Sequence, residues 1–306
     1  MVKWQGVFPA LTTKFYKDGS LDFDTFFRNI DVQLAAGVDG VILGGTLGES
    51  SVLTSDEKKE LTKKTIAYIA GKVPVIMNIA EGSTAEAIIR AKEAGEMGAS
   101  GLMLLPPMRY FSDHRETVAY FKAVAESTTL PIMIYNNPVD YKIYVTLEMF
   151  DELIENENIQ AVKESTRDIS NITRMRTRFG NRFQILCGVD TLALESLLMG
   201  ADGWVAGLVC AFPKETVAIY QLAKADRITE ARDIYSRFLP LLELDIHPKL
   251  VQYIKLAEQQ CGIGTEYVRP PRLPLIREER EAVLAVIETG LHTRPNLPTL
   301  ESKDYV

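Results

Sequence analysis

Residues 101–136 read GLMLLPPMRYFSDHRETVAYFKAVAESTTLPIMIYN and contain one complete strand–helix–strand unit. Gly101–Leu105 and Pro131–Asn136 are nearly continuous apolar runs, a pattern typical of parallel strands that are buried on both faces. Asp113–Ser127, which separates them, has the spacing of an amphipathic helix. A strand, a helix and a second strand in this order predict a βαβ unit in a parallel sheet.

The same unit repeats on both sides of this segment, at intervals of about 25–30 residues. The six other expected strands are Val7–Leu11, Gly40–Gly44, Val73–Ile79, Ile159–Lys163, Phe183–Cys187 and Gly203–Ala206. Further expected helices are Asp56–Ala70, Thr84–Met97, Thr146–Ile154 and Ser170–Phe179. Eight units favour an α/β fold closed into a (β/α)8 TIM barrel, because an open doubly wound sheet would more often carry a nucleotide-binding loop after its first strand.

The residues after the eighth unit predict a C-terminal helical extension. Ile228–Leu244, Pro248–Gln260 and Arg277–Thr289 have helical patterns, and no Gly/Ser-rich linker precedes them. We therefore expect residues 1–225 to form the catalytic barrel and residues 226–306 to pack on it, without forming an independent domain. The polar tail from Arg294 is expected to be loosely held.

Charge and composition exclude several classes of partner. The net charge is −7 and the isoelectric point is about 5.2. An acidic surface repels phosphate backbones and anionic lipids, so we expect neither nucleic acid nor a membrane as a partner. The N-terminal residues contain no apolar signal region, and no apolar run has the length of a membrane helix, so we expect a soluble, cytoplasmic protein.

Metal and nucleotide sites are also not predicted. His114, His247 and His292 lie far apart and form no metal-binding pattern. The glycine-rich Gly44–Gly48 has neither the P-loop lysine nor the dinucleotide-binding spacing. We expect an enzyme that needs no metal and no organic cofactor.

A lysine at the end of the sixth strand is the first candidate for chemistry. In a TIM barrel the active site lies at the C-terminal ends of the strands, and Lys163 ends the buried run Ile159–Lys163. Desolvation disfavours the charged amine, lowers its pKa and makes it nucleophilic. A lysine that reaches outward to a salt bridge would have the same sequence pattern, and the strand alone does not separate the two interpretations.

Three other strand ends carry residues suited to a site. Tyr135 at the end of the fifth strand is placed to relay protons, or is a core tyrosine with its hydroxyl at the rim. Gly44–Ser50 after the second strand leaves backbone N–H groups free to bind a carboxylate, and Thr46 adds a hydroxyl, although a simple tight turn fits as well. Gly188 after the seventh strand permits close approach of a ligand or makes the turn. Together they predict a nucleophile, a phenol and an anion site at one barrel mouth.

Four motifs carry a family resemblance over nearly the whole length. They are Gly45–Glu49 (GTLGE), Tyr135–Pro138 (YNNP), Val162–Glu164 (VKE), and the pair Cys187–Asp190 (CGVD) and Asp202–Gly207 (DGWVAG). With these motifs the chain resembles the dihydrodipicolinate synthase / N-acetylneuraminate lyase family of class I aldolase-like enzymes. The resemblance implies a homotetramer of barrels with helical C-terminal parts.

The resemblance also implies roles for individual residues. Lys163 would form an imine with a 2-oxo acid or its equivalent, and Tyr135 would move protons at the imine-forming carbon. Thr46 would orient Tyr135 by a hydrogen bond. The substrate-binding positions implied are Gly45, Leu47, Gly188 and Val205, with the N–H groups of Thr46 and Leu47 holding the substrate carboxylate.

Three positions differ from the pattern of dihydrodipicolinate synthases. Asp140 stands where those enzymes have an arginine for a second carboxylate-bearing substrate, and Leu47 replaces their second threonine. Their loop tyrosine falls near Met108, so Arg109 or Tyr110 would have to substitute for it. These differences argue against lysine biosynthesis.

Other stretches resemble a branch associated with hydroxyproline breakdown. They are Val162–Asn171, Asp202–Pro213 and Pro270–Leu275. They imply a deaminase that converts 1-pyrroline-4-hydroxy-2-carboxylate to 2,5-dioxopentanoate and ammonia. Alternatives are a 2-oxo-3-deoxy sugar acid aldolase or dehydratase, a dihydrodipicolinate synthase-like enzyme, or a barrel that binds a 2-oxo acid only as a regulator.

Overall fold

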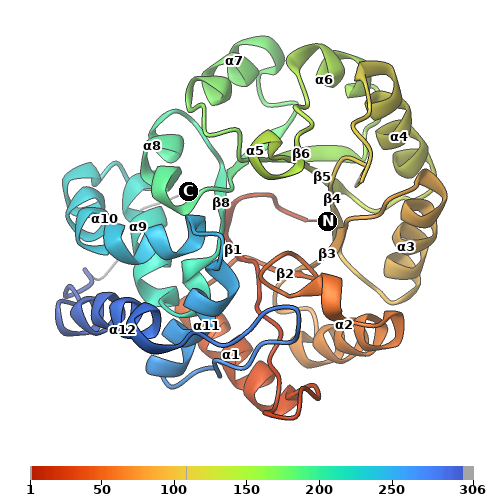
Figure 1. Ribbon diagram of the computed structural model, residues 1–306. Helices are drawn as coiled ribbons and strands as arrows, with labels where there is room; N and C mark the ends of the chain where they lie inside the picture. The colour runs from red at the N-terminus through yellow and green to blue at the C-terminus, as the bar shows by residue number, and fades with distance from the viewer. Residues whose placement is uncertain (1, 108, 299–306) are drawn as a thin grey trace.

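Eight short parallel strands lie side by side at the centre of the molecule. The computed structural model describes residues 2–107 and 109–298. Figure 1 looks down the axis of the ring that the strands form. The strands are β1 (Gly6–Pro9), β2 (Val41–Leu43), β3 (Val75–Ile79), β4 (Gly101–Leu104), β5 (Ile132–Asn136), β6 (Ile159–Glu164), β7 (Gln184–Cys187) and β8 (Gly203–Ala206). Their apolar side chains are buried almost completely, which explains why they read as continuous apolar runs.

The strands close into a barrel in the order of the chain. Each strand from β2 to β8 pairs with the next one, and β8 pairs with β1. The gap between β1 and β2 is bridged at Ala10 and Ile42, and the N–H of Leu11 donates to the carbonyl of Ile42 over 3.0 Å. The predicted (β/α)8 TIM barrel is therefore confirmed.

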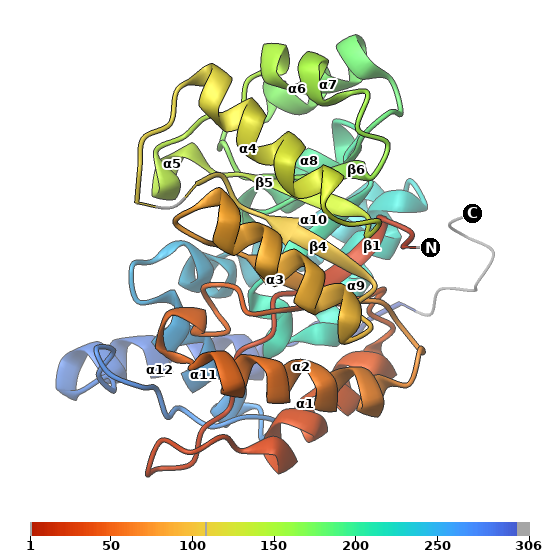
Figure 2. The ribbon, with the colours of Figure 1, turned by 90° about the vertical axis from the view of Figure 1, so that its right-hand side faces the viewer.

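Helices cover the outside of the ring, as Figures 1 and 2 show. They are α1 (Phe23–Ala36), α2 (Ser55–Ile69), α3 (Thr84–Glu96), α4 (His114–Glu126), α6 (Leu147–Leu153), α7 (Ser170–Phe179), α8 (Ala193–Leu198) and α9 (Pro213–Lys224). Capping boxes begin α2 at Thr54 with Glu57 and α4 at Asp113 with Glu116, and they satisfy backbone N–H groups that lack helical partners.

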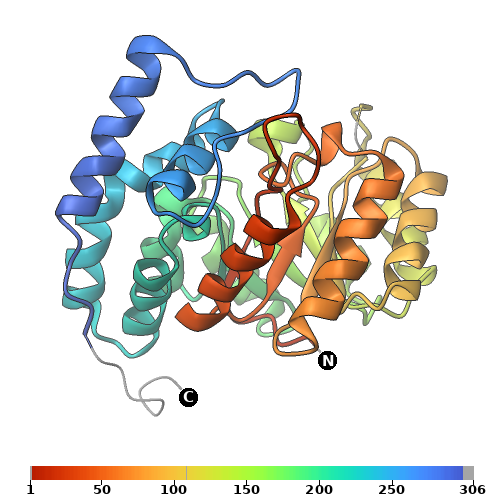
Figure 3. The same ribbon diagram turned by 90° about the horizontal axis from the view of Figure 1, so that it is seen from below.

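Three more helices follow α9. They are α10 (Ile228–Leu242), α11 (Leu250–Gln260) and α12 (Arg277–His292), with the short 3-10 helix η4 (Glu243–Ile246) between the first two. Figure 1 places them beside α9 and α1, and Figure 3 shows α12, in dark blue, along the outside of this group. The expected boundary near residue 225 falls in the turn between α9 and α10.

The helix boundaries on either side of η4 differ from the prediction. The helix expected over 228–244 ends at Leu242, and the one expected from 248 begins at Leu250. Pro248 disfavours the helical conformation at His247, which is extended with φ −84° and ψ 149°. The intervening η4 therefore turns toward the barrel mouth. The end of the predicted polar tail, 299–306, lies outside the described residues.

Two buried ion pairs join α11 to the loops after β1 and β2. Lys14 Nζ lies 2.8 Å from Glu258 Oε1, and Lys255 Nζ lies 2.5 Å from Glu49 Oε1. All four side chains are sealed from solvent. The loops that carry the barrel mouth are thus held by the C-terminal extension. Among the helices of the described residues, none is long and apolar enough to cross a membrane.

Candidate active site at the mouth of the barrel

The residues predicted from strand ends surround one cavity. It has a volume of about 490 Å³ and lies at the C-terminal end of the barrel. All seven residues predicted for the site line it: Gly45, Thr46, Leu47, Tyr135, Lys163, Gly188 and Val205. The structure thus brings them together, while the roles given to them stay predictions.

Lys163 points into this cavity from β6. It is 8% exposed, and strand pairing sets it beside Tyr135, whose ring centroid lies 4.0 Å from its Nζ. The described part of the chain offers no carboxylate within ion-pair distance of this amine, so the alternative of an outward salt bridge is wrong. Burial lowers the pKa of Lys163 below its ordinary value, which favours the neutral, nucleophilic amine.

Tyr135 is held as a neutral phenol. Its hydroxyl accepts a hydrogen bond from Asn137 Nδ2 at 3.0 Å. Burial raises the pKa of Tyr135 to about 12, so the phenol keeps its proton at neutral pH. A protonated hydroxyl close to Lys163 is suited to donating a proton to a reacting oxygen.

The expected hydrogen bond from Thr46 to Tyr135 is wrong. The Thr46 hydroxyl lies 3.1 Å from the hydroxyl of Tyr141, on the short helix α5 (Pro138–Tyr141). Asn137 caps α5 and Pro138 opens it, so the chain turns back over the mouth. The rings of Tyr141 and Tyr135 then meet edge to face with their centroids 5.5 Å apart.

Tyr141 is therefore a site residue that the sequence prediction missed. It lines the cavity, and burial raises its pKa to about 12. An Asn-Pro start followed by an aromatic residue one turn later was the available signal.

Of the proposed substitutes for the loop tyrosine, neither Arg109 nor Tyr110 lines the cavity. Tyr110 is 58% exposed, and its hydroxyl donates to Glu116. Met108 lies outside the described residues.

The loop after β2 presents free backbone donors. Within the described ranges, the N–H groups of Thr46 and Leu47 donate to no protein acceptor. The loop is fixed by two hydrogen bonds: Thr13 donates to the carbonyl of Gly48 at 2.7 Å, and Lys255 donates to the Glu49 carboxylate. Two free N–H groups on a rigid turn form a suitable site for a carboxylate.

The C-terminal extension also contributes to the cavity wall. Asp245 and Ile246 of η4, followed by His247, Pro248 and Leu250, line it together with the strand ends. Asp140, at the position where an arginine was expected for dihydrodipicolinate synthases, also lines it and accepts from Asn137 at 2.7 Å. Sequence analysis did not find Asp245, because no strand pattern leads to it.

Gly188 leaves room for the lysine side chain. A Cβ atom at this position would lie 2.6 Å from Lys163 Cε, 2.7 Å from Lys163 Cγ and 2.1 Å from Ser165 Oγ. All three distances are shorter than real Cβ contacts, so any side chain here must displace Lys163.

We therefore expect Gly188→Ala to slow imine formation by more than about tenfold, because the amine leaves its position beside Tyr135. The rate of borohydride-trapped adduct formation would measure this. Gly71→Ala, at a glycine with open space around its Cβ, is the control for a general effect of the substitution, with any strain from its positive φ checked by thermal denaturation. An unchanged rate in Gly188→Ala would contradict the crowding argument.

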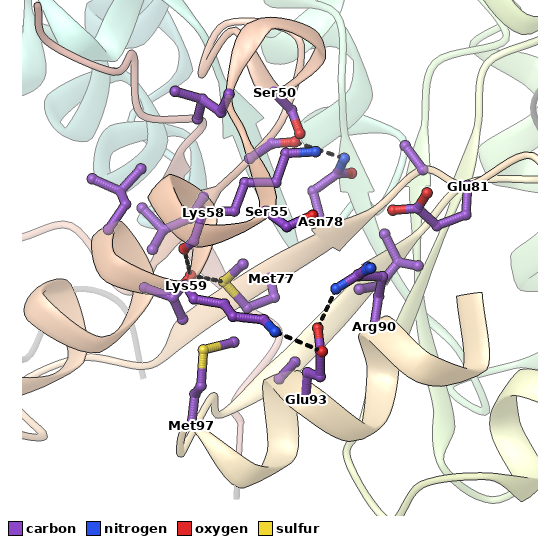
Figure 4. A pocket seen from close by; sticks show the side chains of 18 of the residues that line it. Ser50, Ser55, Lys58, Lys59, Met77, Asn78, Glu81, Arg90, Glu93 and Met97 are labelled. Carbon is purple, nitrogen blue, oxygen red and sulfur yellow. Dashed lines mark hydrogen bonds and ion pairs between the residues drawn. The ribbon is translucent and has the colours of Figure 1, made fainter. Parts of the chain in front are cut away.

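A second cavity, drawn in Figure 4, lies between α2 and α3. It is smaller, about 130 Å³, and four of the charged side chains that line it are paired with one another. Lys59 contacts Glu93 at 2.9 Å, and Arg90 contacts both Glu93 and Glu86. None of the seven predicted site residues lines it, so we place the chemistry in the larger cavity.

Comparisons with known proteins agree with this geometry. The model of the family described as "Dihydrodipicolinate synthetase family" matches residues 3–289. A 4-hydroxy-tetrahydrodipicolinate synthase from Exiguobacterium sibiricum is 34% identical, covering 94% of this chain and 97% of that protein. A dihydrodipicolinate synthase structure from Bacillus anthracis superposes with a TM-score of 0.91 at 28% identity, covering 97% of this chain and 100% of that one. The Acinetobacter baumannii enzyme in complex with pyruvate gives a TM-score of 0.90 at 25% identity, covering 94% and 99%.

Proposed function

This chain belongs to the dihydrodipicolinate synthetase family and is a Schiff-base-forming lyase, and we propose that Lys163 is the lysine that forms the imine, with the 2-oxo group of a small carboxylic acid. One observation carries this proposal. Lys163 is a buried amine for which residues 2–107 and 109–298 offer no ion-pair partner, and it points into a cavity beside a neutral phenol. A structural lysine in such a place would have a counter-ion.

The site supplies each step of imine formation. The neutral amine of Lys163 attacks C2 of the 2-oxo acid, and Tyr135 donates the proton with which the C2 oxygen leaves as water. The free N–H groups of Thr46 and Leu47 hold the substrate carboxylate. The protonated imine then withdraws electrons from C3, so that the phenolate left on Tyr135 takes a proton from C3 and an enamine forms. The enamine either attacks an aldehyde or expels a leaving group from C4.

The activities for which the relatives are named favour one use of this enamine. The Exiguobacterium sibiricum relative is a 4-hydroxy-tetrahydrodipicolinate synthase, and one similar structure holds pyruvate. They support the dihydrodipicolinate synthase-like alternative better than the deaminase of 1-pyrroline-4-hydroxy-2-carboxylate, for which the comparisons offer no support. We propose pyruvate as the first reactant and an aldehyde as the second, in a carbon–carbon bond-forming reaction.

One feature of the cavity favours a second candidate. Asp140 is an acid at the place where the family resemblance implies an arginine for a second carboxylate. A substrate with a single carboxylate avoids the repulsion that Asp140 would cause. The deaminase reaction and the sugar acid aldolase or dehydratase reaction both meet this condition, and they therefore stay proposals. The homotetramer also stays a prediction from the family resemblance.

Borohydride reduction in the presence of pyruvate tests the proposal. We expect an N-(1-carboxyethyl) adduct on the peptide that contains Lys163, detected by mass spectrometry. Turnover assays then separate the reactions. Consumption of pyruvate with aspartate 4-semialdehyde supports the synthase, ammonia release from 1-pyrroline-4-hydroxy-2-carboxylate supports the deaminase, and pyruvate release from a 2-oxo-3-deoxy sugar acid supports the aldolase. A wild-type protein that yields no adduct with any 2-oxo acid would refute the role of Lys163.

A further inference from the structure

Carboxyl groups are unusually frequent around the cavity. Asp140 on α5 and Asp245 on η4 both line it, and Asp190 lies behind its wall. Asp190 is fully occupied, because its carboxylate accepts from Trp204 Nε1 at 2.9 Å, from the N–H of Leu208 at 2.8 Å and from the N–H of Gly207 at 3.2 Å. Its role is to fix the end of β8. Asp140 is held by Asn137. Asp245 differs from both.

Asp245 has a buried oxygen with no hydrogen-bond partner. Its Oδ1 is sealed from solvent, and no group in the described residues donates to it. Leaving such an atom unsatisfied costs about 1–3 kcal/mol. Unpaired buried polar atoms are rare in folded proteins, and each one needs an explanation. The other oxygen, Oδ2, is not sealed in this way, and no group in the described residues donates to it either, so Oδ2 is the atom that a ligand in the cavity can reach.

The fold makes room for this carboxyl group. A Cβ atom on Gly207, which follows β8, would lie 1.8 Å from Asp245 Oδ1 and 2.4 Å from its Cγ. Asp245 therefore rests directly on the backbone of Gly207, and a larger residue there would push it away. The backbone of Asp245 is fixed by its neighbour in η4, Leu244, whose side chain is buried in the core.

The charges around Asp245 decide what it can bind. Burial raises the pKa of Asp245 well above its ordinary value, Asp190 and Asp140 raise it further, and Lys163 opposes this change. A neutral carboxyl group both donates and accepts hydrogen bonds, which suits a hydroxyl or amino group. A second carboxylate at this place would face the acid Asp140 and could bind only while Asp245 keeps its proton, so its binding would be disfavoured.

We propose that Asp245 is a specificity-determining residue, which hydrogen-bonds a hydroxyl or amino group on the distal part of the substrate and disfavours a second carboxylate there. The molecule recognised is then the one that carries the distal group while bound at Lys163, either the product of pyruvate and the aldehyde or the substrate of the reverse or alternative reactions: a 2-oxo acid, or a cyclic imine of one, with a single carboxylate and a polar substituent beyond C3. This inference rests on the proposed function, since it takes C2 of the substrate to be bound to Lys163.

Three 2-oxo acids of the same chain length test this. They are 2-oxopentanoate, 4-hydroxy-2-oxopentanoate and 2-oxoglutarate, which differ in having an apolar end, a hydroxyl group and a second carboxylate. The readout is the concentration that gives half-maximal borohydride-trapped adduct on the Lys163 peptide, counting intact and cleaved adducts together. Each value is divided by that for pyruvate with the same variant. We expect the wild type to prefer the hydroxy acid over the other two by about five- to tenfold, as one hydrogen bond allows.

Two variants and one control complete the experiment. Asp245→Leu is expected to remove the preference for the hydroxy acid over 2-oxopentanoate, and Asp245→Asn is expected to keep it in part while weakening the discrimination against 2-oxoglutarate. Glu243→Gln, at an exposed residue of the same η4, is the matched control. If Asp245→Leu fails to fold, the isosteric Asp245→Asn variant tests the proposal through its weaker discrimination against 2-oxoglutarate.

The outcomes separate the two levels of the proposal. No pyruvate adduct in the wild type would refute the proposed function. A pyruvate adduct together with a wild-type preference for 2-oxoglutarate would overturn the inference. The exposed Arg167 at the cavity rim would then be the residue that binds a second carboxylate. Equal changes for all three acids in both Asp245 variants would also overturn it, because they would show a structural effect only.

Discussion

Replacement of Lys163 by methionine is expected to abolish the borohydride-trapped adduct and to lower kcat/KM by about 10³-fold or more, since the residue that carries covalent catalysis is lost. Methionine is unbranched and close in length, so the packing beside Gly188 is kept. Lys72→Met, at an exposed lysine just before β3 and so at the end of the barrel opposite the site, is the control and is expected to behave as the wild type. An adduct that persists on another lysine in Lys163→Met would contradict the assignment.

The pH dependence of trapping gives the same assignment a second test. Only the neutral amine attacks C2, so the rate rises with pH as Lys163 loses its proton. Burial lowers its pKa below the ordinary value of 10.5, so the rate should reach its plateau at a lower pH than that of a solvent-exposed lysine. The rate is then lost as the pH falls through this lowered pKa. A profile that reaches its plateau only above the ordinary value would show that Lys163 is not desolvated.

Replacement of Glu258 by glutamine is expected to destabilise the protein by about 3–5 kcal/mol, the cost of leaving a buried charge without its partner. Lys14 is fully buried and pairs with Glu258 at 2.8 Å, and Thr12 donates to the same carboxylate at 2.7 Å. Glutamine keeps the shape of the side chain but not its charge. The free energy of unfolding, measured by urea denaturation, gives the size of the effect.

A pair of similar composition on the surface provides the control. Lys249 and Glu279 are 2.6 Å apart, but both are partly exposed, so Glu279→Gln should cost less than about 1 kcal/mol. The double variant Lys14→Met, Glu258→Gln should recover part of the loss of Glu258→Gln, because no unpaired charge remains. Equal losses in Glu258→Gln and Glu279→Gln would mean that the buried pair contributes no more than a surface pair.

Sequence patterns predicted the barrel because each strand carries its own signal. An apolar run such as Gly203–Ala206 needs two buried faces wherever it lies, so eight such runs led to a parallel barrel. The same argument found Lys163, Tyr135 and Gly188, since a strand end in a barrel is also a place at the mouth. The alternatives left open for these residues required the structure, which for Lys163 offers no counter-ion among the described residues.

Other site residues had no local signal. The four-residue helix α5 is too short to show a period, so the return of Tyr141 to Thr46 was not predicted. Asp245 comes after the last strand, and it reaches the cavity only because Pro248 interrupts the helical pattern and Gly207 leaves space. Contacts of this kind depend on tertiary packing and not on sequence period.

The packing of Asp245 against the backbone of Gly207 has a consequence for how such enzymes diversify. The residues that make and break bonds belong to the strands, whereas the acid that we propose to recognise the distal end of the substrate belongs to a short turn that the chain adds afterwards. Selection can therefore act on this turn, and change which metabolite is accepted, while the inherited reaction chemistry remains untouched. In this chain, the four residues of η4 are therefore a place where substrate choice can change without a substitution at a strand end.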